Sequence, residues 1–401
     1  MFRKIHRLLA LFLFIVFLTS CMPAPSIAVH REPESWSYLN PEPTPPPAFD
    51  PGVLDPFRID FRSADLSQLD LSNSLDGLIY ANFDSQTVWP PAGRLPAGFD
   101  PQLVMELGKD PGLGVRELHE RGITGEGVGI AIIDQVLLAD HVEYADRIRV
   151  YEEAEDVPDY WGLSMHGPSV ASIAVGETVG VAPGADLYFI AMGNCHGSVD
   201  IERFDYSCLA RDILRIVEIN EELPARRRIR VLSMSISWWP ENEGYDEITA
   251  AVDVAREAGI FVVGGNFQEE YGFALDGLGR SPLSDPNDFQ AYGPNVWRGS
   301  EYYEDGFAES LLFVPMDART TASPTGYEDY AFFGTGGGSW CVPYLAGVYA
   351  LAVQVKPEIT PEEFWSTALA TGRTIQIEHD GSTYPFGTII DPPALIAALE
   401  E

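Results

Sequence analysis

A glycine-rich turn leads directly into an apolar segment in Gly334-Thr335-Gly336-Gly337-Gly338-Ser339-Trp340-Cys341-Val342-Pro343-Tyr344-Leu345-Ala346-Gly347. Glycines allow tight turns, and the apolar segment after Ser339, which reaches Val355, is long enough for a buried helix. Pro343 fits there because the first N–H groups of a helix need no partner within it. Ser339 is therefore expected at a helix N-terminus, where free N–H groups favour a developing negative charge. This placement suits a nucleophile, but an N-cap serine on an ordinary core helix has the same pattern.

Upstream, an unbroken apolar run ends in a carboxylate at Gly129-Ile130-Ala131-Ile132-Ile133-Asp134. Such a run is typical of a parallel strand buried on both faces. The carboxyl ends of parallel strands are where open α/β sheets bind ligands, and a carboxylate there needs a partner. The alternative is a helix N-cap or turn aspartate.

A histidine stands at the start of His166-Gly167-Pro168-Ser169-Val170-Ala171-Ser172-Ile173-Ala174-Val175-Gly176, which is followed by Gly180-Val181-Ala182-Pro183-Gly184-Ala185. The small residues of the first segment predict a helix that packs closely on its neighbours. His166 is expected at the sheet edge, although a lone histidine is usually structural.

The apolar strand Gly259-Ile260-Phe261-Val262-Val263-Gly264-Gly265 ends in Asn266. Asn266 is therefore expected at the edge where open α/β sheets bind ligands. An asparagine after two glycines is also an ordinary turn.

Together, these segments resemble the motifs of the subtilases, the subtilisin-like serine proteases. The segment from Ser339 to Gly347 is similar to GTSMATPHVAG, and the segment from His166 is similar to HGTHVAG with its GVAPGA continuation. The positions that depart from the family pattern are Gln135, Pro168, Ser169, Trp340, Cys341 and Tyr344.

The resemblance covers residues 112–401 and implies a subtilisin-like three-layer α/β/α fold with a mainly parallel central sheet. Alternating strands and helices independently indicate a parallel sheet covered on both faces. The resemblance implies a catalytic triad of Asp134, His166 and Ser339 with Asn266 as oxyanion donor, in the chain order Asp, His, Asn, Ser that the family shows.

The family's substrate-binding walls map onto Ser235, Ile236, Ser237, Gly264 and Gly265. These walls carry no charge, and two glycines are expected to leave room on one side. They therefore predict an apolar side chain before the scissile bond.

The first twenty residues have the pattern of a secretion signal, with three basic residues and then an apolar run from Leu8 to Leu18. The run is short for a membrane span. Leu18-Thr19-Ser20-Cys21 resembles the bacterial lipobox, which implies lipidation of Cys21. A plain signal peptide with an incidental cysteine is the alternative.

Composition divides the rest of the chain into three parts. Residues 21–58 hold ten prolines and predict an extended tether after the lipidated cysteine. Residues 59–111 form an N-terminal extension of uncertain role, which we interpret as a packing extension because it is short for a folding prodomain. Residues 112–401 are expected to be the catalytic domain.

The chain of 401 residues carries a formal net charge of −35, which argues against binding to nucleic acid. In an exported protein, Cys195 and Cys208 predict a small disulfide loop. A zinc site at these cysteines and His196 lacks a fourth ligand. Cys341 is read as a small buried residue. The sequence predicts no cofactor and no metal site, although a structural calcium ion is compatible with it.

These observations predict an exported serine endopeptidase that hydrolyses peptide bonds and is anchored by lipid at the cell surface or on a periplasm-facing membrane. Its partners are then a peptide or protein substrate and the membrane. The first alternative is a catalytically inactive surface binding lipoprotein on the same scaffold, since several motif positions depart from the family. A solute-binding lipoprotein is a third class, but it does not explain the motifs.

Overall fold

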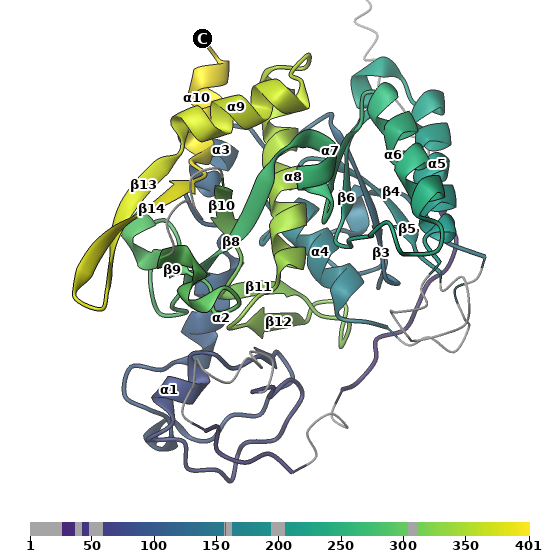
Figure 1. The fold of residues 1–401 in the computed structure, drawn as a ribbon. Helices are drawn as coiled ribbons and strands as arrows, with labels where there is room; N and C mark the ends of the chain where they lie inside the picture. Colours follow the sequence, from purple (N-terminus) through teal and green to yellow (C-terminus); the bar gives the residue numbers. More distant parts are fainter. Residues whose placement is uncertain are drawn as a thin grey trace, which may run out of the picture.

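The computed structural model describes residues 26–36, 42–47, 59–155, 157, 163–193, 205–303 and 311–401. The predicted signal peptide, Cys21 and Cys195 lie outside these residues. Figure 1 shows the described chain with its N-terminal extension, around α1, below the main body.

The centre of the molecule is a six-stranded sheet in the order β1-β4-β5-β3-β6-β7, and all neighbouring strands pair in parallel. The prediction of an α/β fold with a mainly parallel central sheet is therefore confirmed. The strands are β1 (Ser26–Ile27), β3 (Gly129–Asp134), β4 (Ile148–Glu153), β5 (Asp186–Ala191), β6 (Ile229–Met234) and β7 (Phe261–Gly264).

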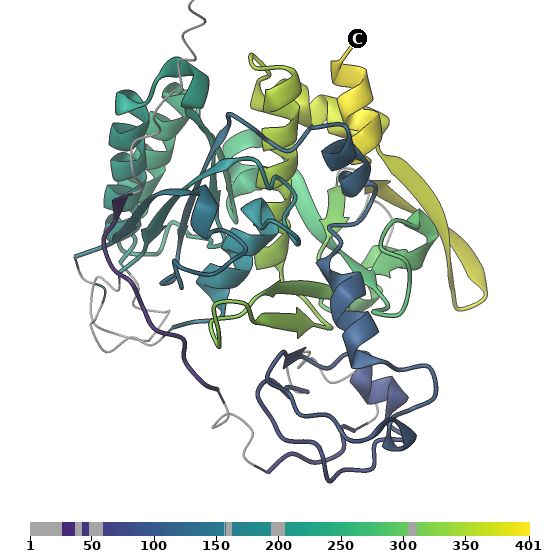
Figure 2. The ribbon, with the colours of Figure 1, turned by 180° about the vertical axis from the view of Figure 1, so that it is seen from behind.

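Alternate side chains of β3 reach the two faces of this sheet, which explains its unbroken apolar sequence. Ile130 and Ile132 belong to the core formed with α4 (His166–Val175) and α8 (Gly338–Val355). Ala131 and Ile133 belong to a second core, formed with α5 (Ser207–Glu222) and α6 (Tyr245–Glu257). Figures 1 and 2 show these helix pairs on opposite sides of the sheet, so the domain has three layers.

A second sheet of five strands continues the domain in the order β13-β14-β10-β8-β9. Its strands are β8 (Ala274–Arg280), β9 (Tyr292–Pro294), β10 (Leu311–Pro315), β13 (Arg373–His379) and β14 (Ser382–Ile389). The helices α3 (Val115–Glu120), α7 (Phe267–Tyr271), α9 (Pro361–Thr371) and α10 (Pro392–Leu399) complete this part of the chain.

The N-terminal extension shares a sheet and a core with the domain above it. Its strand β2 (Phe83–Asp84) pairs with β12 (Tyr330–Phe333), which in turn pairs with β11 (Arg319–Ala322). The rings of Phe83 and Phe332 lie 5.0 Å apart, tilted by 33°, in a common apolar cluster. The remaining helices here are α1 (Leu75–Leu78) and α2 (Pro101–Lys109). The extension is thus packed on the domain.

Part of the predicted tether is docked rather than extended. Strand β1 adds to the edge of β4, and Arg31 forms a two-point ion pair with Glu153 at 2.7 and 2.8 Å. The carboxylate of Glu34 accepts a hydrogen bond from the N–H of Leu163 at 2.8 Å. The proline content of residues 21–58 gave no signal of these contacts because strand pairing is made by backbone groups.

Among the described residues, α8 alone has the length and apolar composition needed to cross a membrane. Its most apolar window is 78% buried inside the domain. We therefore describe α8 as the core helix that carries Ser339 near its start.

Candidate active site

Asp134 and His166 meet at the carboxyl end of the central sheet. Asp134 is the last residue of β3 and is 3% exposed, and His166 is the first residue of α4. His166 Nδ1 lies 2.6 Å from Asp134 Oδ1, which also accepts a hydrogen bond from the N–H of Gln135 at 2.8 Å. The carboxylate predicted to need a partner has one, and it is the predicted histidine.

Gly167 permits this close approach. A Cβ atom at this position would overlap the carbonyl oxygen of Gln135 and lie 2.7 Å from that of Val136. Any larger residue would therefore push the start of α4 away from the chain that follows β3. The glycine of the histidine segment thus has a packing reason that is visible only in the fold.

Two opposing effects act on the pKa of His166. Burial lowers this pKa, but the charge of Asp134 and the hydrogen bond to it raise it, and the raising effects win. The imidazolium form of His166 is therefore more stable, relative to the neutral form, than it is in a free histidine. A group that has to take up a proton during catalysis benefits from such support.

Ser339 is the second residue of α8, and its neighbour Trp340 lies beside His166. The ring centroids of Trp340 and His166 are 5.7 Å apart, in an edge-to-face arrangement. The carbonyl oxygen of Ser339 accepts a hydrogen bond from Ser235 Oγ at 3.0 Å. No hydrogen bond joins the Ser339 hydroxyl to His166, although both residues belong to the described part of the chain. Such contacts are often long in unliganded enzymes.

The glycine loop before Ser339 is fixed by two side chains that the sequence motifs did not indicate. The N–H of Gly336 donates to Asp317 Oδ1 at 2.7 Å, and the indole Nε1 of Trp297 donates to the carbonyl oxygen of Gly336 at 2.8 Å. Both backbone groups of Gly336 are thus bound. The sequence pattern could have indicated Asp317, because this carboxylate follows the apolar strand β10 in the same way that Asp134 ends β3.

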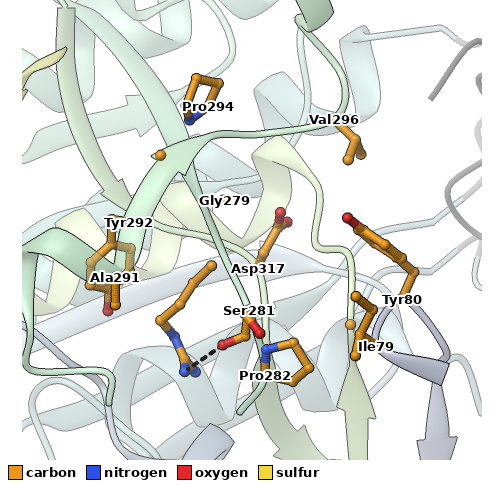
Figure 3. Close-up of a pocket in the computed structure, with 13 residues that line it drawn as sticks. Ile79, Tyr80, Gly279, Ser281, Pro282, Ala291, Tyr292, Pro294, Val296 and Asp317 are labelled. Atoms are coloured by element: carbon orange, nitrogen blue, oxygen red, sulfur yellow. Dashed lines mark hydrogen bonds between the residues drawn. The ribbon is translucent and has the colours of Figure 1, made fainter. Parts of the chain in front are cut away.

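Asp317 lies beside a cavity of about 300 Å³ between the N-terminal extension and strands β8 and β9. Figure 3 shows its carboxylate directed into this space, with Tyr80 on the opposite side. Burial raises the pKa of Asp317 to about 7, although the N–H of Gly336 and the charge of Arg280 act against the rise.

Asn266 caps α7 and has its amide bound to the backbone of Trp238. Its Oδ1 accepts from the Trp238 N–H at 2.9 Å, and its Nδ2 donates to the Trp238 carbonyl oxygen at 2.6 Å. The residue is 8% exposed. One N–H of the amide is left for another acceptor, because an asparagine amide carries two.

The predicted substrate-binding walls lie against each other. Strand β6 ends at Met234, so Ser235, Ile236 and Ser237 follow the strand. The N–H of Gly265 donates to the carbonyl oxygen of Ile236 at 2.9 Å. A Cβ on Gly265 would overlap the Ser237 hydroxyl, and one on Gly264 would lie 3.2 Å from the Met234 carbonyl oxygen. At Gly265 the expected room is taken by the Ser237 side chain.

Two departures from the family motifs have partners within the fold. Ser169 Oγ lies 2.8 Å from Thr321 Oγ1, and both residues are buried. Tyr344 is buried, with the guanidinium of Arg319 5.8 Å from its ring centroid.

The cysteines fall into different environments. Cys208 is disulfide-bonded, while its predicted partner Cys195 lies outside the described residues. Cys341 is a buried free thiol whose pKa is raised by burial. Within the described ranges, no group of three or more His, Cys, Asp or Glu is arranged to hold a metal ion.

Comparison with known proteins shows which family this part of the chain is similar to. Residues 125–297 match the Subtilase family. The chain is 24% identical over 265 residues to a thermostable alkaline protease of Halalkalibacterium halodurans, a match that covers 62% of this chain and 63% of the relative. It is 26% identical over 254 residues to an extracellular serine proteinase of a Thermus species, with 61% and 55% covered. The chain thus spans less than two thirds of the length of either relative.

Among solved structures, the prenylagaramide maturation protease PagA is similar with a TM-score of 0.49 and 15% sequence identity, over 71% of this chain and 98% of that one. The family match covers the strand that ends in Asp134, the helix that begins with His166 and the strand before Asn266. Over residues 125–297, the chain is thus similar in sequence to the subtilase family of serine proteases.

Proposed function

We propose that this protein is an exported, membrane-anchored serine endopeptidase. The observation that carries the proposal is the 2.6 Å contact between His166 Nδ1 and Asp134 Oδ1, with Trp340, the neighbour of Ser339, against the same imidazole. An imidazole fixed by a buried carboxylate, close to a helix N-terminus that carries a serine, is the arrangement by which serine peptidases hydrolyse peptide bonds.

In the proposed reaction, Ser339 attacks the peptide carbonyl carbon while His166 Nε2 takes the hydroxyl proton. His166 then returns this proton to the leaving amine, and a water molecule hydrolyses the acyl-enzyme by the same route. Asp134 keeps the proton on His166 Nδ1 and stabilises the imidazolium. The N–H of Ser339 and the remaining amide N–H of Asn266 serve as donors to the oxyanion.

Membrane anchoring is the second part of the proposal. The basic and apolar pattern of residues 1–20, followed by Cys21, supports export and lipidation. Acyl chains on this cysteine would keep the enzyme on the cell surface or on a periplasm-facing membrane. An extracellular serine proteinase among the relatives is compatible with a site of action outside the cytoplasm.

An inactive surface binding protein is the second candidate. Two observations favour it: the Ser339 hydroxyl makes no hydrogen bond to His166, and two atoms of the Asn266 amide are bound to Trp238. Binding of a peptide segment without cleavage would then be the function of the same surface.

A fluorophosphonate probe tests the proposal. The wild-type protein should be labelled and should cleave an unfolded protein substrate, and Ser339→Ala should lose both properties while it keeps the circular dichroism spectrum of the wild type. Equal labelling of wild type and Ser339→Ala would remove Ser339 as the nucleophile. A folded wild type that is neither labelled nor active would favour the binding protein.

Membrane fractionation tests the anchor. Cys21→Ser should move the protein from the membrane to the soluble fraction while peptidase activity is retained, with Cys341→Ser as a thiol-loss control that stays in the membrane. Retention of Cys21→Ser in the membrane would mean that the signal segment is itself the anchor.

A further inference from the structure

The carboxylate of Asp317 lines a cavity, and only one of its two oxygen atoms accepts a hydrogen bond from the described residues. Asp317 is 5% exposed, and its Oδ1 accepts the hydrogen bond from the N–H of Gly336. Among the described residues, nothing donates to its second oxygen. This oxygen belongs to a largely buried carboxylate that lines the cavity, so a charged donor brought into the cavity by a ligand would be favoured.

The nearest basic group does not serve this oxygen. The guanidinium of Arg280, which also lines the cavity, donates to the carbonyl oxygens of Ser281, Ser284 and Ala318 at 3.2, 2.6 and 2.9 Å. Its hydrogen-bond donors are therefore directed to backbone rather than to Asp317. The positive charge of Arg280 partly offsets the negative charge of Asp317, but it makes no hydrogen bond to the second oxygen of the carboxylate.

The walls of the cavity suit the stem of a long side chain. Six of the thirteen lining residues have large apolar or aromatic side chains: Ile79, Tyr80, Pro282, Tyr292, Pro294 and Val296. In Figure 3 these residues surround the space into which the Asp317 carboxylate points. Long cationic side chains bury their methylene stems on such surfaces, and their charged heads favour aromatic rings and carboxylates.

A metal ion fits the cavity less well. Asp317 is the only carboxylate among the residues that line it. Calcium takes six to eight oxygen ligands, and magnesium needs an octahedral set. The volume of about 300 Å³ is at the lower end of the range of about 300 to 1,000 Å³ for ligand pockets, which suits one side chain.

The cavity is adjacent to the loop that carries the proposed nucleophile. Gly334 is one of its lining residues, and Gly336 is bound to Asp317. Ser339 is five positions after Gly334, and a step of five residues spans at most about 18 Å when fully extended. A side chain within about five positions of the scissile bond could therefore reach the cavity.

We infer that this cavity binds the guanidinium or ammonium group of an Arg or Lys side chain of the peptide substrate, with Asp317 as its counter-ion. The inference rests on the proposed peptidase function and names a substrate class for it. The formal net charge of −35 acts in the same direction, since it attracts basic peptides to the protein.

The experiment uses peptide pairs that differ only by Arg or norleucine at one of the five positions on either side of the cleaved bond. For one position, the ratio of kcat/KM for the two peptides should be at least about 10 in the wild type. In Asp317→Asn the ratio should fall to about 1, because asparagine can still accept the hydrogen bond from Gly336 but carries no charge. The matched control is Asp380→Asn, which removes a charge from an exposed residue, 89% accessible, and should keep the wild-type ratio.

A second variant covers the case in which Asp317→Asn does not fold. Val296→Arg introduces a cation at the wall of the cavity and should also reduce the ratio to about 1, whereas Val296→Leu should preserve it. A wild-type ratio retained in Asp317→Asn or Val296→Arg would overturn the inference, as would a ratio near 1 at all ten positions of the wild type.

Binding to Ser339→Ala separates this inference from the proposed function. Fluorescence anisotropy of labelled peptides should give a Kd about tenfold lower for the Arg peptide than for its norleucine counterpart, and Asp317→Asn in the same background should remove the difference. Preferential binding without any cleavage by the wild type would contradict the peptidase function and support the cavity. Cleavage of both peptides at equal rates would support the peptidase function and contradict the cavity.

Discussion

The side-chain amide of Asn266 binds both backbone groups of Trp238, with its Oδ1 2.9 Å from the Trp238 nitrogen and its Nδ2 2.6 Å from the Trp238 oxygen. This two-point contact joins the end of β7 to the segment that follows β6. It fixes the direction of the amide, so that its second N–H has one possible orientation. A donor held in this way needs no reorganisation during the reaction, which is the property an oxyanion donor requires.

Substitution of Asn266 should therefore affect both catalysis and stability. We expect Asn266→Ala to lower kcat by about 10² to 10³, the range known for the corresponding subtilisin donor. The free energy of unfolding should fall by about 1 to 3 kcal/mol, because the buried backbone of Trp238 loses its partners. Steady-state kinetics and urea unfolding measure the two effects. An unchanged kcat in Asn266→Ala would assign the oxyanion hole to other donors.

The pH dependence should reflect the raised pKa of His166. Only the neutral imidazole can accept the Ser339 proton, so kcat/KM should fall as the pH drops through this pKa, at a pH above the value of about 6.5 for a free histidine. The contribution of His166 to stability has the opposite sign. It is fully present below the pKa of the unfolded chain and is lost as the pH rises through the pKa of the folded state.

Asp134→Asn tests the cause of that shift. Without the carboxylate, burial alone acts on His166, so the acidic limb of the kcat/KM profile should move to lower pH. The rate should also fall by about 10⁴, as it does for the equivalent change in the serine protease triad. An acidic limb at the same pH in this variant would show that another group controls it.

Gly167 should be intolerant of even a methyl group. Gly167→Ala is expected to displace the start of α4 from the carbonyl oxygens of Gln135 and Val136 and so to separate His166 from Asp134. A displacement of about 1 Å can cost about 10²-fold in rate. Gly93→Ala is the matched control, because a Cβ there meets no atom within 4 Å and kcat should stay unchanged. Equal activity of the two variants would mean that α4 absorbs the added methyl group.

Contact between the predicted pocket walls should restrict the side chain that precedes the scissile bond. Because the Ser237 side chain occupies the space beside Gly265, we expect the wild type to prefer Ala or Ser over Leu or Phe at this position. Ser237→Gly should raise the ratio of kcat/KM for Phe over Ala peptides by about tenfold or more, within the range for pocket size changes. Ser72→Gly, at an exposed position, is the control. A wild type that already prefers Phe would show that substrates separate these walls.

The local sequence was sufficient to predict an element where the whole pattern lies within one segment. The unbroken apolar run of β3 predicted a strand buried on both faces, and the charged residue at its end predicted a partner at the sheet edge. The contact of Asp134 with His166 follows from the order of parallel strands, since their carboxyl ends meet at one edge.

Contacts between distant segments could not be predicted in the same way. Asp317 and Trp297 meet Gly336 across 19 and 39 residues, and Tyr80 reaches their neighbourhood from the N-terminal extension. The contact between the two predicted pocket walls, Ser235–Ser237 and Gly264–Gly265, depends on how far the segments after β6 and β7 stay paired beyond the apolar parts of these strands. Neither set of contacts produces a periodic pattern in the sequence, because each is made by single residues in irregular loops.

The pairing of β1 with β4 limits how far from the membrane an enzyme anchored at Cys21 can act. Ser26, the first residue of β1, follows Cys21 by five residues, and five residues reach at most about 18 Å. An acylated Cys21 would hold the edge of the domain at β1 within this distance of the lipidated residue, instead of at the end of a long flexible arm. Its accessible substrates would then be polypeptide segments close to the lipid headgroups, such as the juxtamembrane regions of neighbouring proteins.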